Sequence, residues 1–386
     1  MKRIYSIDFT RGLVMIIMAL DHVRDLIHVS SVTQRPTDLN TTTPILFFTR
    51  WITYLCAPVF VFLAGTSAYL SFKSKGNFSE SRKFLFKRGL WLVLLEFSIV
   101  NFALFFDAGF HTFIFEVIAA IGFGFIVLSL ILKSSLKTIS IIGFIIIFGY
   151  GLLQQISFAP GSKINTVLSL LFSSGAFPIS SNRVFIMAYP PIPWLGIMLL
   201  GFAAGKLFEL PFDERKKIFV RIGSGSLLLF IIIRFINIYG DPFPWSSQKN
   251  LMFSFLSFMN ITKYPPSLLF CLITLGIMFL ILAIAERKNR LTPIFTVYGK
   301  VPLFYFVLHF YIIHSLLLII LFLQGIRWSE MAFATGTFGR PNGTESGLQL
   351  WAVYLIWIII VTLLYLPCKR FGKYKSGHSY WWLRYL

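Results

Sequence analysis

Charged residues are scarce in this chain of 386 residues: only 13% are Asp, Glu, Lys or Arg, whereas 56% are hydrophobic and 44 are Phe. This balance is far from that of a water-soluble globular domain, so a soluble protein is excluded. Polar stretches are also short, and none is large enough to fold separately. We therefore predict one membrane domain over residues 1–386.

Cysteines are few as well, and the three present are Cys56, Cys271 and Cys368. They fall in or beside different apolar segments and show no CxxC spacing, which supports neither a disulfide framework nor a zinc site and predicts buried thiols. The pair Gly223-Ser-Gly225 is too short for a nucleotide fingerprint. The net charge is +20. A nucleic-acid partner would require a soluble module with a basic face, and the sequence contains no such module. We expect no metal and no nucleic-acid partner.

Long apolar runs recur from one end of the chain to the other. A helix needs about 20 apolar residues to cross a hydrocarbon core of about 30 Å. The predicted fold class is therefore all-α, a polytopic membrane helical bundle with about 10 transmembrane helices. The predicted segments are roughly 9–29, 46–72, 89–106, 113–132, 138–158, 192–208, 218–239, 266–285, 301–323 and 348–367.

The distribution of basic residues predicts the orientation in a cell membrane. An even number of spans places both termini on one side, and 25 of the 35 Lys and Arg residues then fall in the terminal segments and the loops of that side, including 73–88. The positive-inside bias predicts that both termini are cytoplasmic. Two outer loops, about 159–190 and 324–347, either cover an outward-facing site or serve as ordinary connections.

The first apolar run carries five ionisable residues within eight positions: Asp21, His22, Arg24, Asp25 and His28. An Asp or Arg at the bilayer centre costs at least about 2.5–3.5 kcal/mol, so such groups face protein or water. At 100° per residue, four of the five share an arc of about 100°, and His22 lies about 60° from Asp25. This helix is expected inside the bundle, with the cluster in the outer half of the membrane.

The cluster supports two interpretations. Asp21, Arg24 and Asp25, together with Arg50 of the second segment, either form a buried ion network that fixes helix packing or belong to a catalytic site. His22 favours the catalytic interpretation, because an imidazole titrates near neutrality and serves as a base or a nucleophile. The carboxylates of Asp21 and Asp25 are candidates to set its tautomer and basicity.

The segment Ser6-Ile-Asp8-Phe-Thr-Arg11-Gly12, followed by an apolar helix, resembles the catalytic domain of the heparan-α-glucosaminide N-acetyltransferase family, which belongs to a transmembrane acyltransferase superfamily. Further similar segments are spread over nearly the whole chain. They are residues 20–25, 48–51, 57–65, 264–267 and 302–309, with His314.

The resemblance implies that the protein moves an acyl group, acetyl in this family, from cytoplasmic acyl-CoA to a hydroxyl or amine of an extracytoplasmic sugar or glycan. Arg11 and His22 match the pattern Arg, ten residues, His of related acyltransferases, which implies a catalytic His22 and a donor contact at Arg11. The heparan enzyme places its His later, which corresponds to the neighbourhood of His28, so both histidines stay candidates. Related acyltransferases carry paired arginines at the cytoplasmic start of the third helix. The resemblance implies Lys87 and Arg88 as the corresponding donor contacts in this chain, where the spacing of the basic residues differs.

Arg24 or Arg50 is expected to stabilise the oxyanion of the transition state. His309 and His314 lie five residues apart and face different directions, so at most one is expected to reach the same cavity. The competing hypothesis is a transporter or channel that uses the cluster as a proton or substrate pathway. The crowding of charges into one helix favours the enzyme, and an oligomer is compatible with the sequence.

Overall fold

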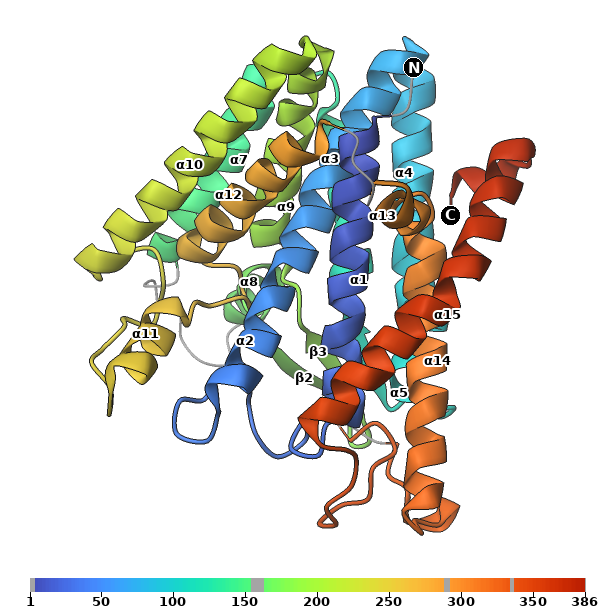
Figure 1. The fold of residues 1–386 in the computed structure, drawn as a ribbon. Coiled ribbons are helices and arrows are strands. Elements are labelled where there is room, and N and C mark those ends of the chain that lie inside the picture. The colour runs from blue at the N-terminus through green and yellow to red at the C-terminus, as the bar shows by residue number, and fades with distance from the viewer. Residues whose placement is uncertain (1–3, 154–162, 288–291, 334–336, 386) are drawn as a thin grey trace.

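The computed structural model describes residues 4–153, 163–287, 292–333 and 337–385. Helices dominate these residues and form a bundle (Figure 1). The α-helices are α1 Tyr5–Ile27, α2 Pro44–Ile52, α3 Cys56–Lys75, α4 Phe78–Leu95, α5 Asn101–Phe105, α6 Val117–Ile131, α7 Leu136–Leu153, α8 Lys163–Phe172, α9 Pro191–Ala204, α10 Phe212–Ile236, α11 Leu251–Met259, α12 Leu268–Ala285, α13 Thr292–Gly299, α14 Pro302–Leu323 and α15 Leu350–Gly377. Shorter helical turns are η1 Thr53–Leu55, the π-helical η2 Glu96–Val100, η3 Gly205–Glu209, η4 Trp328–Glu330 and η5 Trp381–Arg384.

Eight helical stretches among the described residues are long and apolar enough to cross a membrane. They are Pro44–Lys75, Phe78–Phe105, Leu136–Leu153, Pro191–Glu209, Phe212–Ile236, Leu268–Ala285, Pro302–Leu323 and Leu350–Gly377. The predicted all-α polytopic bundle is confirmed. The two other predicted segments correspond to α1, which carries five Asp and Arg residues, and to α6, which has 15 residues. The predicted segment 138–158 runs into residues 154–158, which lie outside the described residues.

The third predicted segment, 89–106, begins too late. Helix α4 begins at Phe78 because Asn77 caps it and accepts a hydrogen bond from the backbone N–H of Glu80 at 3.1 Å. Lys87 and Arg88 therefore lie inside the helix and not in the preceding loop. Long basic side chains are tolerated there because their apolar stems pack along the helix while their charged ends reach polar surroundings.

A small sheet interrupts the helical architecture and was not predicted. Strand β1, Thr112–Phe115, pairs in parallel with β3, Arg183–Met187, and β3 pairs antiparallel with β2, Gly175–Ser180. The apolar strand β1 is followed almost directly by the apolar helix α6. Hydropathy alone does not separate the two, and it therefore predicts one membrane segment, 113–132. Strands β2 and β3 lie beside the lower part of α1 in the view of Figure 1, and the side-chain amide of Asn101 on α5 donates a hydrogen bond to the carbonyl of Thr112 in β1 at 2.9 Å.

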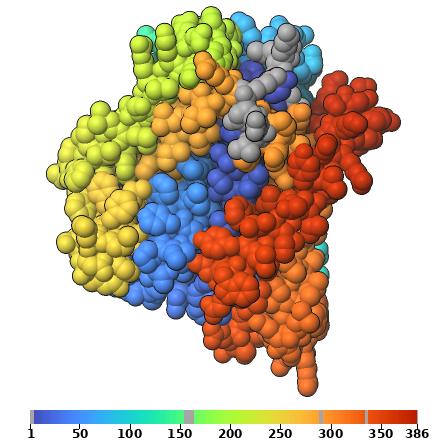
Figure 2. Space-filling model, viewed as in Figure 1, coloured from blue at the N-terminus to red at the C-terminus, as the bar shows by residue number. Residues whose placement is uncertain are grey.

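Helix α1 lies in the interior of the bundle, as its charges predicted. Sixteen of its 23 residues are buried, and Figure 2 shows only a small part of it at the surface, between α12 and α15. The indole of Trp357 on α15 donates a hydrogen bond to the carbonyl of Ile16 at 2.7 Å. The thiol of Cys56, buried like those of Cys271 and Cys368, contacts the carbonyl of Val14 at 3.4 Å.

The backbones of α1 and α13 are in direct contact through two glycines. A Cβ atom on Gly12 would lie 1.7 Å from the carbonyl oxygen of Phe295, and one on Gly299 would lie 1.8 Å from that of Asp8. No larger residue fits at either position unless a helix moves, because a Cβ atom would overlap the facing backbone. This contact fixes the beginning of α1 and with it Arg11, the residue before Gly12.

The other end of α1 is tied to the loop before α15. Arg340, which is buried, donates hydrogen bonds to the carbonyl oxygens of Leu26 at 2.6 Å and His28 at 3.0 Å. The backbone N–H of Leu348 donates to the carbonyl of Ile27 at 2.8 Å. Because the last carbonyls of a helix lack partners within the helix, these bonds satisfy them and hold the loop against α1.

Candidate active site

Two cavities lie next to each other along α1. The arginine cavity, with a volume of about 270 Å³, has Arg11, Ser67, Ser71 and Arg88 as its polar lining. The histidine cavity, about 250 Å³, has Asp21, His22, Asp25, Glu116 and Lys263 as its ionisable lining, with Tyr189 and Tyr264. Phe60, Val117 and Phe306 line both cavities and so form the apolar wall between them.

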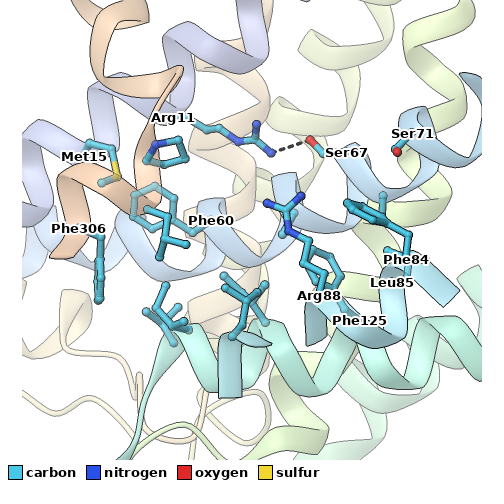
Figure 3. Close-up of a pocket in the computed structure, with 18 residues that line it drawn as sticks. Arg11, Met15, Phe60, Ser67, Ser71, Phe84, Leu85, Arg88, Phe125 and Phe306 are labelled. Carbon is cyan, nitrogen blue, oxygen red and sulfur yellow. Dashed lines mark hydrogen bonds between the residues drawn. The ribbon is translucent and has the colours of Figure 1, made fainter. Parts of the chain in front are cut away.

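The arginine cavity brings together two cations from different helices. Figure 3 shows the guanidinium groups of Arg11 and Arg88 turned toward each other beside Ser67. Arg11 donates hydrogen bonds to the Ser67 hydroxyl at 2.6 Å and to the carbonyl of Leu63 at 2.8 Å. The Arg88 guanidinium lies 5.7 Å from the ring of Phe125. Two like charges on one cavity favour an anion between them.

Lys87 does not share this position. It is exposed and does not line the arginine cavity, whereas its neighbour Arg88 does. Adjacent helical residues point about 100° apart, so only one of the two can face the cavity. Of the basic residues that the resemblance implied as donor contacts, the cavity therefore contains Arg11 and Arg88.

His22 is held by a second histidine. Its Nδ1 lies 2.6 Å from Nε2 of His309, and the Nδ1 of His309 lies 3.1 Å from the carbonyl oxygen of Tyr305. A carbonyl only accepts, so a neutral His309 carries its proton on Nδ1 and presents a bare Nε2 to His22. His22 then carries its own proton on Nδ1, and this arrangement leaves its Nε2 with an available lone pair.

Aromatic rings complete the surroundings of His22. Its imidazole stacks on Phe310 with ring centroids 4.2 Å apart and meets Phe306 edge to face at 6.2 Å. Among the described residues, Nε2 of His22 makes no hydrogen bond, and the side chain is only partly buried. The lone pair is thus available to a molecule in the histidine cavity, where a base or a nucleophile could act.

The remaining charges of α1 form an ion network with Arg50 of α2. Arg24 lies 2.7 Å from both Asp21 and Asp25, and Arg50 lies 2.5 Å from Asp21. Neither Arg24 nor Arg50 lines the histidine cavity, although both carboxylates do. The two guanidinium groups are therefore engaged by the carboxylates, and this geometry favours a structural role over the expected contact with an oxyanion.

Two other histidines lie apart from both cavities. The Nδ1 of His28 lies 3.0 Å from the Ser30 hydroxyl, and the His28 side chain lines neither cavity. His314 is fully buried, with Nδ1 3.3 Å from the carbonyl of Ala103 and its ring against the edge of Phe106. Of the pair on α14, His309 alone contacts His22.

Glu116, Lys263 and Tyr189 were not singled out as site residues in the sequence. Because β1 and β3 are parallel, the residues that follow the two strands lie at the same end of the sheet. There the backbone N–H of Tyr189 donates a hydrogen bond to the carbonyl of Phe115 at 3.1 Å. Glu116 and Tyr189 thereby reach the cavity wall. The two predicted outer loops, 159–190 and 324–347, also line this cavity, through Ile186 and Phe338 respectively. Residues 159–162 and 334–336 of these loops lie outside the described residues.

No metal site accompanies these residues within the described ranges, where no group of three or more His, Cys, Asp or Glu side chains could hold a metal ion. The fold and the two cavities define a multi-pass membrane protein with a polar site enclosed in its helical bundle.

A comparison with known families supplies the identification. The family model described as heparan-alpha-glucosaminide N-acetyltransferase, catalytic, matches residues 3–235, and the chain therefore belongs to this family of membrane acetyltransferases. The match includes Arg11, His22 and Arg88. The similar segments at 264–267 and 302–309 lie beyond it. No curated protein matches the chain.

Proposed function

We propose that this chain is a single-domain enzyme of the cell membrane, comprising residues 1–386, that transfers an acetyl group from cytoplasmic acetyl-CoA to an extracytoplasmic sugar or glycan. The observation that carries the proposal is the adjacency of two cavities, one with paired arginines and the other with an oriented histidine. Family membership supports the acetyl donor and the carbohydrate acceptor.

The donor occupies the arginine cavity in this proposal. Arg11 and Arg88 bind a phosphate of coenzyme A through charge-assisted hydrogen bonds, for which guanidinium groups are suited. The pantetheine arm extends along the apolar lining toward Phe60 and Phe306. Arg11 and His22 are eleven residues apart on one helix, about 16 Å, which this arm can cover.

The acceptor enters the histidine cavity and is activated there. Nε2 of His22 removes a proton from the acceptor hydroxyl or amine as the oxygen or nitrogen attacks the thioester carbonyl. The tetrahedral intermediate collapses, the C–S bond breaks, and the coenzyme A thiolate leaves and takes the proton from His22. His309 accepts the hydrogen bond of Nδ1–H throughout and so keeps His22 in the required orientation.

Orientation in the membrane is part of the proposal. The basic residues concentrate toward the end of the bundle where α1 begins and α15 ends (Figure 1), and the positive-inside bias supports a cytoplasmic position for that end. The arginine cavity then opens from the side where acetyl-CoA is made. The histidine cavity, bordered by the loops after β3 and before α15, faces the acceptor side.

Donor binding and thioester consumption test this function without knowledge of the natural acceptor. Purified full-length protein is given labelled acetyl-CoA with a panel of amino sugars, and His22→Ala is compared with His28→Gln as the control. The wild type and His28→Gln should bind coenzyme A and release it as free thiol, and His22→Ala should bind it without turnover. A wild type that neither binds coenzyme A nor consumes its thioester contradicts the proposal and favours a transporter.

A further inference from the structure

Lys263 is a buried cation whose charge the catalytic proposal does not use. Its side chain lines the histidine cavity, and the residue is only 6% exposed. The ammonium lies 4.8 Å from the ring centroid of Tyr264 and 5.9 Å from that of Tyr54. It forms no ion pair and donates no hydrogen bond to any residue that the structure describes. A buried ammonium that makes no direct ion pair or hydrogen bond is costly, so an anionic group on a bound molecule would stabilise it.

The segment that precedes Lys263 is fixed by the side chains of Asp241 and Arg234. Asp241 accepts hydrogen bonds from the backbone N–H and the hydroxyl of Thr262 at 2.8 and 2.9 Å. Arg234, itself buried, donates to the carbonyl oxygens of Ser257 at 2.9 Å and Asn260 at 2.8 Å. These bonds hold the backbone that precedes Lys263, so its ammonium reaches the cavity from a preorganised segment.

The charges in and around the cavity balance, but two of the charged groups have no direct partner. The two carboxylates of α1 are already matched by Arg24 and Arg50. Lys263 and Glu116 remain as one cation and one anion that line the same cavity without forming an ion pair with each other. A molecule that offers an anion to Lys263 and a hydrogen-bond donor to Glu116 would satisfy both.

We propose that Lys263 binds an anionic substituent of the acceptor, a carboxylate or phosphate group on the sugar, while Glu116 accepts a hydrogen bond from its hydroxyl or amino groups. This inference rests on the proposed function and refines it, because it predicts that the enzyme selects acidic sugars. The anion would be a specificity contact, separate from the proton transfer at His22.

A matched pair of acceptors tests this selectivity. Glucosamine and glucosamine 6-phosphate differ only in the anion, and both are given to full-length protein in phosphatidylcholine vesicles, whose headgroups carry no net charge. We expect a lower KM for the phosphorylated sugar in the wild type. Lys263→Met should raise that KM by about 30-fold or more, the effect of unpairing a buried charge, and should bring the ratio of the kcat/KM values of the two sugars close to one. Lys263→Arg should retain most of the preference.

Binding measured without turnover provides a second arm. Glucosamine 6-phosphate should raise the thermal unfolding temperature of the wild type and of Lys263→Arg but not that of Lys263→Met, and inorganic phosphate should compete. Repetition in vesicles with phosphatidylglycerol shows whether a lipid phosphate occupies the site. A preference that disappears there would assign the anion site to lipid and overturn the acceptor role.

Three further results would contradict the role of Lys263. The first is a wild type that binds and uses both sugars equally. The second is an equal loss of kcat for both sugars in Lys263→Met, which would indicate a role in the chemical step. The third is loss of coenzyme A binding in Lys263→Met, which would indicate a structural role. Failure of the proposed function is separate, since it removes donor binding and thioester consumption from the wild type itself.

Discussion

The two halves of α1 differ in how they are built. The first half packs its backbone against α13 through Gly12 and directs one cation, Arg11, into the arginine cavity. The second half is held by the loop before α15, where Gly347 lies against the carbonyl of Ile27, and it carries a network of charges beside His22. One helix is thus held in two ways: packing against α13 positions its beginning, and ion pairs and hydrogen bonds position its end.

Replacement of His22 by Ala should produce the largest effect on activity. Loss of the base should lower kcat by about 10²–10⁴-fold, while affinity for coenzyme A stays within about threefold because the arginine cavity is unchanged. Turnover of labelled acetyl-CoA and equilibrium binding of coenzyme A measure the two quantities. A His22→Ala enzyme with wild-type kcat would remove His22 from the chemistry and leave His28 as the remaining candidate on α1.

Asp21→Ala should break the network of the second half. Arg24 and Arg50 would lose a buried partner, and removal of one member of such a network costs about 3–5 kcal/mol in unfolding free energy. Thermal unfolding in detergent measures the loss. Asp25→Asn is the control, because the Asp25 side chain is 40% exposed and water can replace its contacts. Equal destabilisation by both changes would contradict the assignment of Asp21 to the centre of the network.

His309→Ala should lower kcat by about 100-fold without affecting KM for acetyl-CoA, because His22 would lose the group that orients it. His309→Gln offers an amide oxygen to the Nδ1–H of His22 and should restore most of the rate. A purely structural role for His309 predicts instead that both variants lose thermal stability together and that the glutamine brings no recovery. The same preparations therefore yield the rates and the unfolding temperatures.

Arg88→Ala should weaken coenzyme A binding by about tenfold, the loss of one charge-assisted contact of about 1.4 kcal/mol. Lys87→Ala is a matched control on the same helix, and it should leave affinity unchanged because Lys87 does not line the arginine cavity. Titration of coenzyme A into each purified variant gives the dissociation constants. Equal effects of the two changes would indicate that the overall positive charge of α4 attracts the donor and that no specific contact exists.

Phe60→Ala should have the smallest effect and concerns the wall between the cavities. Phe60 lines both, so its truncation should enlarge the space where the acyl group passes and allow longer acyl chains. We expect the kcat/KM ratio of butyryl-CoA to acetyl-CoA to rise by about 10-fold, in line with the 1–3 kcal/mol that pocket size contributes to discrimination. An unchanged ratio would locate the passage elsewhere.

The sequence predicted the helical bundle and the interior position of α1 because both follow from hydropathy and from the cost of charges in lipid. Arg11, His22 and Arg88, which were candidates from the sequence, each line one of the cavities, and their roles stay predictions. Lys87 and Arg88 could not be separated, since the true start of α4 depends on the Asn77 cap and not on hydropathy.

The rest of the site depends on tertiary contacts that no local pattern encodes. At most one of His309 and His314 was expected to reach the cavity, and the contact of His309 with His22 spans 287 positions of the chain. Glu116 reaches the cavity through pairing of β1 with β3, which are about 70 residues apart. Lys263 follows a connecting segment that is fixed by Arg234 and Asp241, and its position in the histidine cavity is visible only in three dimensions.

Transfer of the acetyl group across a sealed membrane would separate the donor side of the protein from the acceptor side. Full-length protein is reconstituted in one orientation, acetyl-CoA labelled in its acetyl group is supplied at the face that carries the termini, and an amino sugar is supplied at the opposite face. We expect labelled acetyl sugar on the far side, at least about 100-fold less of it from His22→Ala, and none when donor and acceptor exchange sides. Product that forms only when donor and acceptor are on the same side would contradict it.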